Sequence, residues 1–181
     1  MKLKTFNDIN ITNPLAPYFQ VGDRQRIRFG WTVLEENPGL LKEIFKSLKL
    51  EKQSKVDCTF LSAYESEGFK QKEKLHLGRK FVITNWKETK IWSDDLECTC
   101  VYTTITNLNA ERLYRYMIGL MKGHERQLHI CFYNETYLLY TSSDVLDIVS
   151  SESNISILKD VFREHYDKYH EEGEGGESKV V

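Results

Sequence analysis

Two pairs of cysteine and histidine residues have the types and spacing of possible metal ligands. Cys98 and Cys100 lie two residues apart within a predicted strand, and so do His129 and Cys131. Each pair projects from one face of its strand, so neighbouring strands could bring four ligands to one zinc ion. The spacing argues against this site, because structural zinc sites favour two to four residues between paired ligands on turns. We favour reduced, buried cysteines, Cys58 among them, and leave open whether the four side chains converge on a metal.

Carboxylates at the end of a predicted strand are a second candidate for chemistry. Asp144 and Asp147 follow the last predicted hairpin, and with His129 they could serve an acid–base or metal-dependent enzyme. Aspartate is, however, more common in turns for purely conformational reasons. The sequence contains no Gly-x-Ser-x-Gly, no phosphate-binding glycine loop and no His-Glu-x-x-His. We therefore predict no catalytic residue and no cofactor, and an enzyme is the third hypothesis.

Basic residues occur in two groups that could contact phosphates. Arg26 and Arg28 are predicted on the solvent side of the first strand, and Lys70, Lys72 and Lys74 follow in a charged loop. These five residues support an alternative hypothesis, a nucleic-acid-binding module. The 25 basic residues are balanced by 27 acidic ones, giving a net charge of −2. Such a balance is more typical of a solvated surface than of a nucleic-acid-binding face.

Two tryptophans flank a polar turn further along the chain. Trp86 and Trp92 precede Asp94 and Asp95, which are predicted at the tip of a loop over residues 86–96. Exposed tryptophan beside acidic residues is the composition of a protein-binding hot spot. These four residues are the predicted partner-binding site. The alternative is a loop that folds back and buries both indoles.

The elements that must position these residues follow from the spacing of apolar side chains. Alternation from Ile27 to Val33 indicates a half-buried strand from residue 24, and an apolar stripe at helical spacing indicates a helix over 38–49 that Asn37 caps. The same patterns predict further strands at 56–64, 79–85, 97–106, 127–133, 136–141 and 145–149, and further helices at 109–121 and from about 153 to 169. This mixed order favours an α+β fold, a mainly antiparallel sheet with about three amphipathic helices packed against one face.

The length of 181 residues favours a single domain. Two prolines and two asparagines over 10–17 predict an irregular arm over 1–22, followed by the α+β domain over 23–170. The glycine-rich acidic tail over 171–181 is expected to be disordered. No signal peptide or membrane-spanning run is evident, so we expect a cytoplasmic protein without a membrane partner.

Motifs near the two ends of the chain resemble a family of small uncharacterised bacterial proteins common in Bacillus and its relatives. The resembling segments are Ile27-Arg28-Phe29, Leu139-Tyr140, residues 145–149 and Tyr166-Asp167-Lys168-Tyr169. The sequence departs from the family at Ser142-Ser143-Asp144, where members carry Asp-Asp-Arg-Gly. The resemblance implies a fold rather than an activity, because the family's biochemical role is not established.

The absence of a catalytic motif and the aromatic and acidic segment together favour one function. We expect a non-enzymatic intracellular protein-interaction protein, of the kind that includes immunity or inhibitor proteins that bind and mask a partner.

Overall fold

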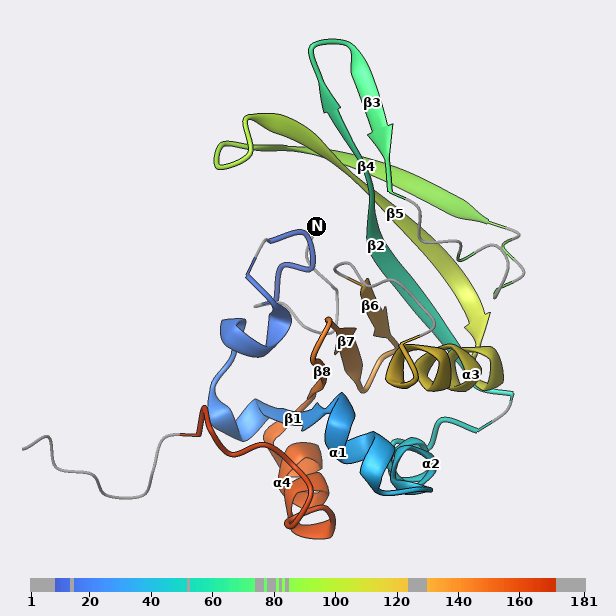
Figure 1. Cartoon of the computed structure of the whole chain (residues 1–181), viewed down its shortest axis with the longest axis vertical. Coiled ribbons are helices and arrows are strands. Elements are labelled where there is room, and N and C mark those ends of the chain that lie inside the picture. The colour runs from blue at the N-terminus through green and yellow to red at the C-terminus, as the bar shows by residue number, and fades with distance from the viewer. Residues whose placement is uncertain are drawn as a thin grey trace, which may run out of the picture.

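The computed structural model describes residues 9–13, 15–51, 53–73, 77, 81, 83, 85–123 and 130–171. These residues form an α+β structure in which eight strands make one antiparallel sheet and four α-helices pack beside it (Figure 1). The α+β class and the antiparallel sheet agree with the sequence patterns. None of the helices in the described part of the chain is long and apolar enough to cross a membrane.

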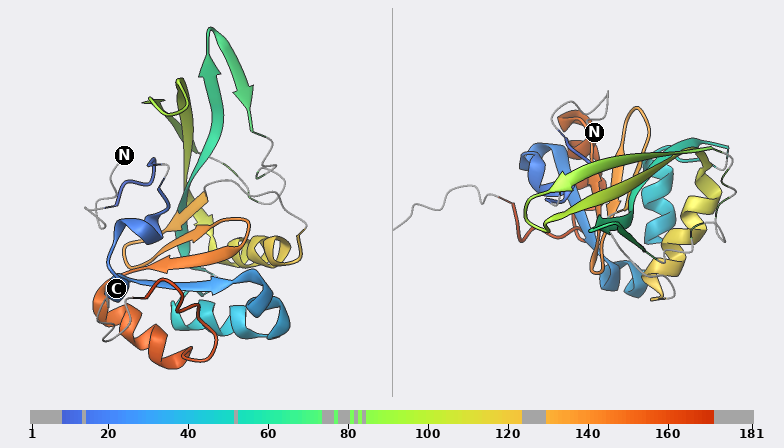
Figure 2. Two further views of the ribbon diagram at one scale, coloured as in Figure 1. Left: turned by 60° about the vertical axis from the view of Figure 1, so that its left-hand side comes forward. Right: turned by 90° about the horizontal axis from the view of Figure 1, so that it is seen from above.

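The sheet has the strand order β1-β8-β7-β6-β2-β5-β4, and β3 pairs with β2 outside this path. The strands are β1 (Arg26–Gly30), β2 (Lys55–Ser66), β3 (Phe69–Lys72), β4 (Trp86–Ser93), β5 (Cys98–Asn109), β6 (Ile130–Tyr133), β7 (Leu138–Thr141) and β8 (Val145–Val149). Strands β2 and β5 are each 12 residues long. The first half of β2 pairs with β6 and its second half pairs with β3. Strands β3, β2, β5 and β4 therefore continue beyond the layer of helices as a projecting part of the sheet (Figure 2).

One large core holds the helices against the sheet. The helices are α1 (Trp31–Glu36), α2 (Leu40–Ser47), α3 (Ala110–Met121) and α4 (Glu152–Val161), with a short 3₁₀ turn η1 (Pro17–Gln20) in the arm and another, η2 (Asp23–Gln25), directly before β1. Apolar residues from all four α-helices, such as Ile44, Leu113 and Ile155, join strand residues such as Phe29 and Phe132 in one buried cluster. Burying these side chains stabilises the fold, because each one removes apolar surface from water.

The opposite face of the sheet lies under the N-terminal arm. Ile9 and Ile11 pack with Tyr133, Leu138 and Val149 in a second buried cluster. The arm is also tied to β5, because the Tyr102 hydroxyl donates to the Thr12 carbonyl at 3.0 Å. The arm therefore forms a second layer over this part of the sheet.

The predicted first strand is too long. β1 ends at Gly30, and α1 begins at Trp31, where the backbone N–H of Trp31 donates to the Asp144 carbonyl at 3.0 Å and its indole donates to the Ser142 carbonyl at 2.9 Å. The alternation was ambiguous, because Trp31 and Leu34 are also three residues apart on one helical face. This short helix is the one that the estimate of about three helices omitted. Asn37 caps the C-terminus of α1 rather than the N-terminus of α2.

The largest difference between the predicted and the observed strands is at β4. Residues 86–93 form a strand that turns at 94–97 into β5, whereas we predicted a loop there and a strand over 79–85. The described residues of 79–85, namely Phe81, Ile83 and Asn85, lie outside any strand. Five of the eight residues of β4 are exposed, including members of both faces, so no apolar alternation marks it.

Two boundaries near the C-terminus also differ. Helix α4 ends at Val161 rather than near residue 169, and both Val161 and Tyr169 are exposed. Strands β6 and β7 are joined through residues 134–137 rather than by a two-residue turn, and the Asn134 side chain accepts two backbone N–H bonds in this loop. Helix α3 and strand β8 lie within a residue of the predicted ranges, and α3 begins as predicted with Asn109 as its cap.

Candidate functional site

The projecting part of the sheet has a face that no described helix covers, and we call it the open face. The register of β4 against β5 places Trp86 beside Ile105, Glu88 beside Thr103, Lys90 beside Val101 and Trp92 beside Thr99. Successive side chains of a strand point to opposite faces, so Trp86, Glu88, Lys90 and Trp92 share one face. Ile105 belongs to the helix-covered core, which shows that the open face continues the same side of the sheet beyond the helices.

Both tryptophans of the predicted partner site are exposed on the open face. Trp86 is 64% exposed and Trp92 is 59% exposed. The Trp92 indole N–H donates to Asp94 Oδ1 at 2.9 Å, which fixes the ring next to the turn that also holds the exposed Asp95. The alternative with both indoles packed inward therefore does not hold. Partner binding by these four residues stays a prediction.

Between the two tryptophans lies a row of ion pairs, which we call the charge ladder. Lys70 Nζ of β3 is 3.7 Å from Glu65 of β2 and 3.3 Å from Glu88 of β4, and Lys90 Nζ of β4 is 2.7 Å from Glu65. The hydrogen bond from Lys90 lowers the pKa of the Glu65 carboxyl. Exposed ion pairs of this kind add little to stability, because water and salt screen them, so the charge ladder matters more for the shape and charge of the surface.

A buried apolar side chain lies among the residues of the charge ladder. Val101 lies on the open face between Lys90 and Ala63 and is nevertheless fully buried. We attribute this cover to the aliphatic stems of the paired lysines, because long charged side chains often lie along apolar surface with their charges in water.

A hollow lies at each end of the charge ladder. One of about 670 Å³ is lined by residues that include Glu65, Lys70, Trp92 and Thr99. The other, of about 350 Å³, is lined by residues that include Phe60, Lys72, Trp86 and Ile105. Each hollow therefore has one tryptophan in its wall, and a partner can reach apolar surface at two points on either side of a charged ridge.

The predicted solvent-facing arginine row is wrong. Arg28 is buried, and its Nε and Nη2 atoms donate to Asp147 Oδ1 at 2.6 Å and Oδ2 at 2.9 Å. The Tyr18 ring of the arm lies 4.0 Å from the Arg28 guanidinium carbon and 4.3 Å from that of Arg26. The arm thus covers the face that we expected to be solvated, and Arg28 is not available to a phosphate.

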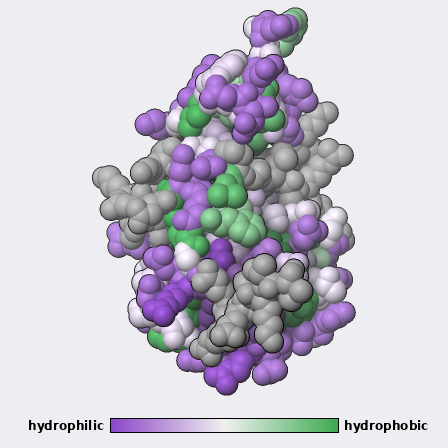
Figure 3. Space-filling model, turned by 90° about the vertical axis from the view of Figure 1, so that its left-hand side faces the viewer, coloured by the Kyte–Doolittle hydropathy of each residue, from purple (hydrophilic) through white to green (hydrophobic). Residues whose placement is uncertain are grey.

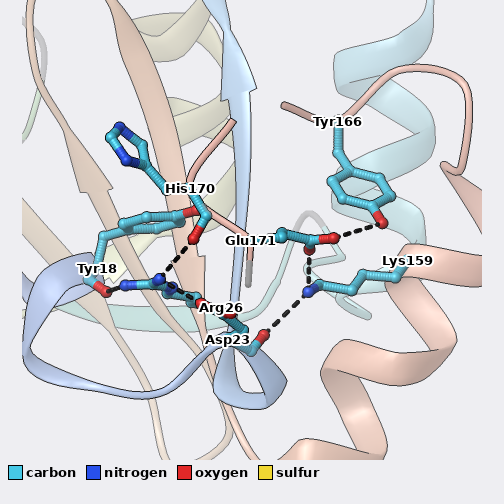
Figure 4. A network of polar contacts seen from close by, with 7 residues as sticks. All are labelled: Tyr18, Asp23, Arg26, Lys159, Tyr166, His170 and Glu171. Carbon is cyan, nitrogen blue, oxygen red and sulfur yellow. Dashed lines mark hydrogen bonds and ion pairs between the residues drawn. The ribbon is translucent and has the colours of Figure 1, made fainter. Parts of the chain in front are cut away.

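Arg26 belongs to a network that fastens the arm to the C-terminal segment (Figure 4). Arg26 pairs with Asp23 and donates to the Tyr18 and His170 carbonyls at 2.9 Å, and Lys159 donates to the Asp23 carbonyl at 2.9 Å. The network is completed by the contacts of Lys159 and Tyr166 with Glu171. Glu171, which we assigned to the disordered tail, is therefore held in place, and residues 172–181 lie outside the described part of the chain.

The lysines of the nucleic-acid hypothesis do not extend the arginine row. Lys70 and Lys72 lie in β3 on the projecting part of the sheet, and Lys70 is paired with two carboxylates. Lys74 lies outside the described residues. Most side chains on the described surface in Figure 3 are hydrophilic, and hydrophobic ones form small separate patches. The five predicted basic residues therefore do not form one basic surface in the described part of the chain.

The cysteines lie in separate buried environments. Cys98 and Cys100 pack with Leu61 and Tyr102, whereas Cys131 packs under the arm, and His129 lies outside the described residues. Burial raises the pKa of Cys131 to about 12, which disfavours the thiolate that metal binding requires. Within the described residues, no three His, Cys, Asp or Glu side chains are grouped to hold a metal ion.

The two candidate carboxylates do not meet. Asp147 is buried against Arg28, where burial raises the pKa of its carboxyl and the hydrogen bonds from Arg28 oppose that rise. Asp144 is exposed before β8 and accepts a hydrogen bond from Ser143 Oγ at 3.0 Å. Asp147 is therefore the counter-ion of a buried arginine.

Buried tyrosines make the fold sensitive to high pH. Burial raises the pKa of Tyr102 and of Tyr133 to about 12, compared with about 10 for an exposed phenol. Their contribution to stability is complete below pH 10 and is lost as the pH rises toward 12, because the unfolded chain releases these protons first. The free energy of unfolding, measured with urea at several pH values, should fall above about pH 10.

The contrast between two substitutions tests this explanation. Tyr133→Phe should flatten the pH dependence above about pH 10, at the cost of the 3.0 Å hydrogen bond to Thr59 Oγ1. Thr59→Val removes the same hydrogen bond but keeps the Tyr133 phenol, so the pH dependence above about pH 10 should remain. An unchanged free energy of unfolding from pH 9 to about pH 11 would contradict the explanation.

The fold and the site define a class: an α+β protein whose antiparallel sheet is covered by helices along one part and carries two exposed tryptophans on its projecting part. A scan against protein-family models, a search of curated proteins and a search of solved structures each found no match to the chain. The resemblance of its ends to the bacterial family therefore stays a prediction.

Proposed function

We propose that this is a non-enzymatic protein-interaction protein and that the open face binds another protein. The observation that carries the proposal is the pair of exposed tryptophans on one face of β4, with the charge ladder between them. Tryptophan is strongly enriched among the residues that dominate binding energy. Such residues lie in well-packed pockets from which water is excluded. Each of these indoles lines such a hollow.

The charges of the open face suggest what the partner looks like. The charge ladder alternates in sign, so a partner that pairs with it needs acidic and basic groups in register. Asp94 and Asp95 add negative charge beside Trp92, which favours a basic or amide-bearing group at that end. The proposed partner surface is therefore apolar at two points and of mixed charge between them.

We further propose that binding masks a site on the partner, as an immunity or inhibitor protein in the cytoplasm does. Support comes from the separation of the candidate catalytic groups, since Asp147 is committed to Arg28 and Asp144 lies apart from it in the solvent. A sheet surface that is already formed in the free chain is suited to blocking a partner's site, because less ordering is needed on binding.

Capture of a partner from the native host tests the proposal. The wild-type chain, the double variant Trp86→Ala/Trp92→Ala and the control Ile157→Ala would be immobilised in parallel. Ile157 is as exposed as the tryptophans but lies on α4, away from the open face. A protein retained by the wild type and the control but lost with the double variant supports the proposal, and equal retention by all three refutes it.

A further inference from the structure

Strand β4 forms one edge of the sheet, and no strand in the described part of the chain pairs with its outer side. Its eight residues pair with β5 without a bulge, from Trp86 opposite Ile105 to Ser93 opposite Cys98. Among the described residues, none makes a backbone hydrogen bond to the outer side of β4. The other edge differs, because the Asp167 N–H donates to the Arg28 carbonyl of β1 at 2.8 Å. A long, regular and uncovered edge is ready to pair with another strand.

The open-face residues of β4 are complementary to themselves when the strand is reversed, whereas Lys87 and Ile91, which meet on the other face, are not. Counted outward from Thr89, the first residues on the two sides are Glu88 and Lys90, which have opposite charge, and the third residues are both tryptophan, Trp86 and Trp92. An antiparallel pair of identical strands places residues at equal distances from the centre opposite each other. The β4 edge can therefore pair with a second copy of itself.

We propose that a second copy of the chain binds the β4 edge, with the two β4 strands antiparallel and Thr89 facing Thr89 of the second copy on a two-fold axis. Glu88 then faces Lys90 of the second copy, and Trp86 faces Trp92 of the second copy, each relation occurring twice. Cross-strand aromatic pairs and opposite charges are the side-chain pairs that stabilise antiparallel sheets. The two sheets become one, and their open faces lie on the same side.

Charge selects this register over its neighbours. Sliding one strand by two residues in one direction puts Glu88 opposite its own counterpart, and sliding in the other direction does the same to Lys90. Like charges directly opposite each other destabilise a strand pair. A slip by one residue instead turns one sheet over, so that the half-buried Ile91 of one copy meets the open face of the other.

The charge ladder fits the same arrangement. Within one chain Lys90 already contacts Glu65, and Glu88 contacts Lys70. Across the two-fold axis the row reads Glu65 and Lys90 of one copy, then Glu88 and Lys70 of the other, so the signs alternate without a break. This inference goes beyond the proposed function, because it concerns the strand edge and needs no other protein.

Charge reversal in the purified full-length chain tests the proposal. Analytical ultracentrifugation of the wild type should show a monomer–dimer equilibrium. Glu88→Lys alone and Lys90→Glu alone should each weaken the dimer about 10- to 100-fold, because two attractive pairs become repulsive. An equimolar mixture of the two variants should recover dimers. The first variant then has lysine at positions 88 and 90, the second has glutamate at both, and each lysine faces a glutamate across the two-fold axis. Lys42→Glu, an exposed change of the same charge on α2, should leave the equilibrium unchanged.

The mixture separates a pairing effect from damage within one chain. Loss of the contacts of Glu88 with Lys70, or of Lys90 with Glu65, would not be repaired by mixing. A wild type that stays monomeric throughout its soluble concentration range overturns the proposal, and so do single variants that dimerise like the wild type, or a mixture that stays monomeric. Partner binding by the open face is measured separately, so neither result decides the other.

Discussion

Replacing Asp147 by alanine is expected to lower the free energy of unfolding by about 3–5 kcal/mol. The carboxylate is fully buried on β8 and accepts hydrogen bonds from Arg28 Nε at 2.6 Å and Nη2 at 2.9 Å. Its removal leaves the buried guanidinium beneath the Tyr18 ring without its hydrogen-bonded counter-ion. Urea unfolding followed by circular dichroism at neutral pH measures the loss.

Two further variants show whether the loss arises from the unpaired charge. Asp144→Ala changes an exposed carboxylate three residues away and should alter the free energy of unfolding by no more than about 0.5 kcal/mol. The double variant Arg28→Met/Asp147→Leu removes both charges and should regain much of the stability that Asp147→Ala loses. A cost below about 1 kcal/mol for Asp147→Ala would contradict a buried, mutually dependent pair.

Arg28 also shows where sequence patterns stop being informative. Alternation along β1 correctly separated Ile27 and Phe29 from Arg26 and Arg28, but alternation only divides residues between two faces. It does not say which faces another part of the chain covers. The aromatic Tyr18 in the arm was the available sequence signal, because such a side chain needs apolar surface to pack on, and it is buried in the structure.

The helices and central strands could be predicted because one of their faces is buried. The Leu40–Ser47 helix and β5 carry apolar residues at the periods of helix and strand, and these residues enter the core. β4 lacks such a period, because it lies at an edge and is largely exposed. Prediction from the sequence therefore failed at the strand that carries the candidate site.

The residues of the open face come together only through the sheet register. The sequence indicated Trp86 and Trp92 by their residue type, but as the ends of a loop rather than as members of one strand face. Glu65, Lys70 and Lys90 lie on three different strands, and only the pairing of β2 with β3 and β5 brings them together. The charge ladder therefore had no local signal in the sequence, and the symmetric pattern of residues 86–92 acquires a meaning only once those residues are known to form an edge strand.

Replacing Trp92 by alanine is expected to weaken partner binding about 30- to 1000-fold, since tryptophan hot spots contribute about 2–4 kcal/mol to affinity. We expect a larger loss of affinity for Trp92 than for Trp86. The hydrogen bond to Asp94 holds the Trp92 ring in place, and Trp92 lines the larger of the two hollows. The Trp92 side chain therefore loses less conformational entropy when the partner binds. Titration calorimetry with the captured partner gives the dissociation constant.

The folded state should not suffer from this change, because the side chain of Trp92 is 59% exposed and leaves no core cavity when it is shortened. Trp92→Phe should retain part of the affinity, since it keeps an aromatic ring but loses the contact with Asp94. Asp94→Asn should have a smaller effect, because an amide oxygen can still accept from the indole. Equal affinity of Trp92→Ala and the wild type, measured at the same oligomeric state, would place the partner site elsewhere on the molecule.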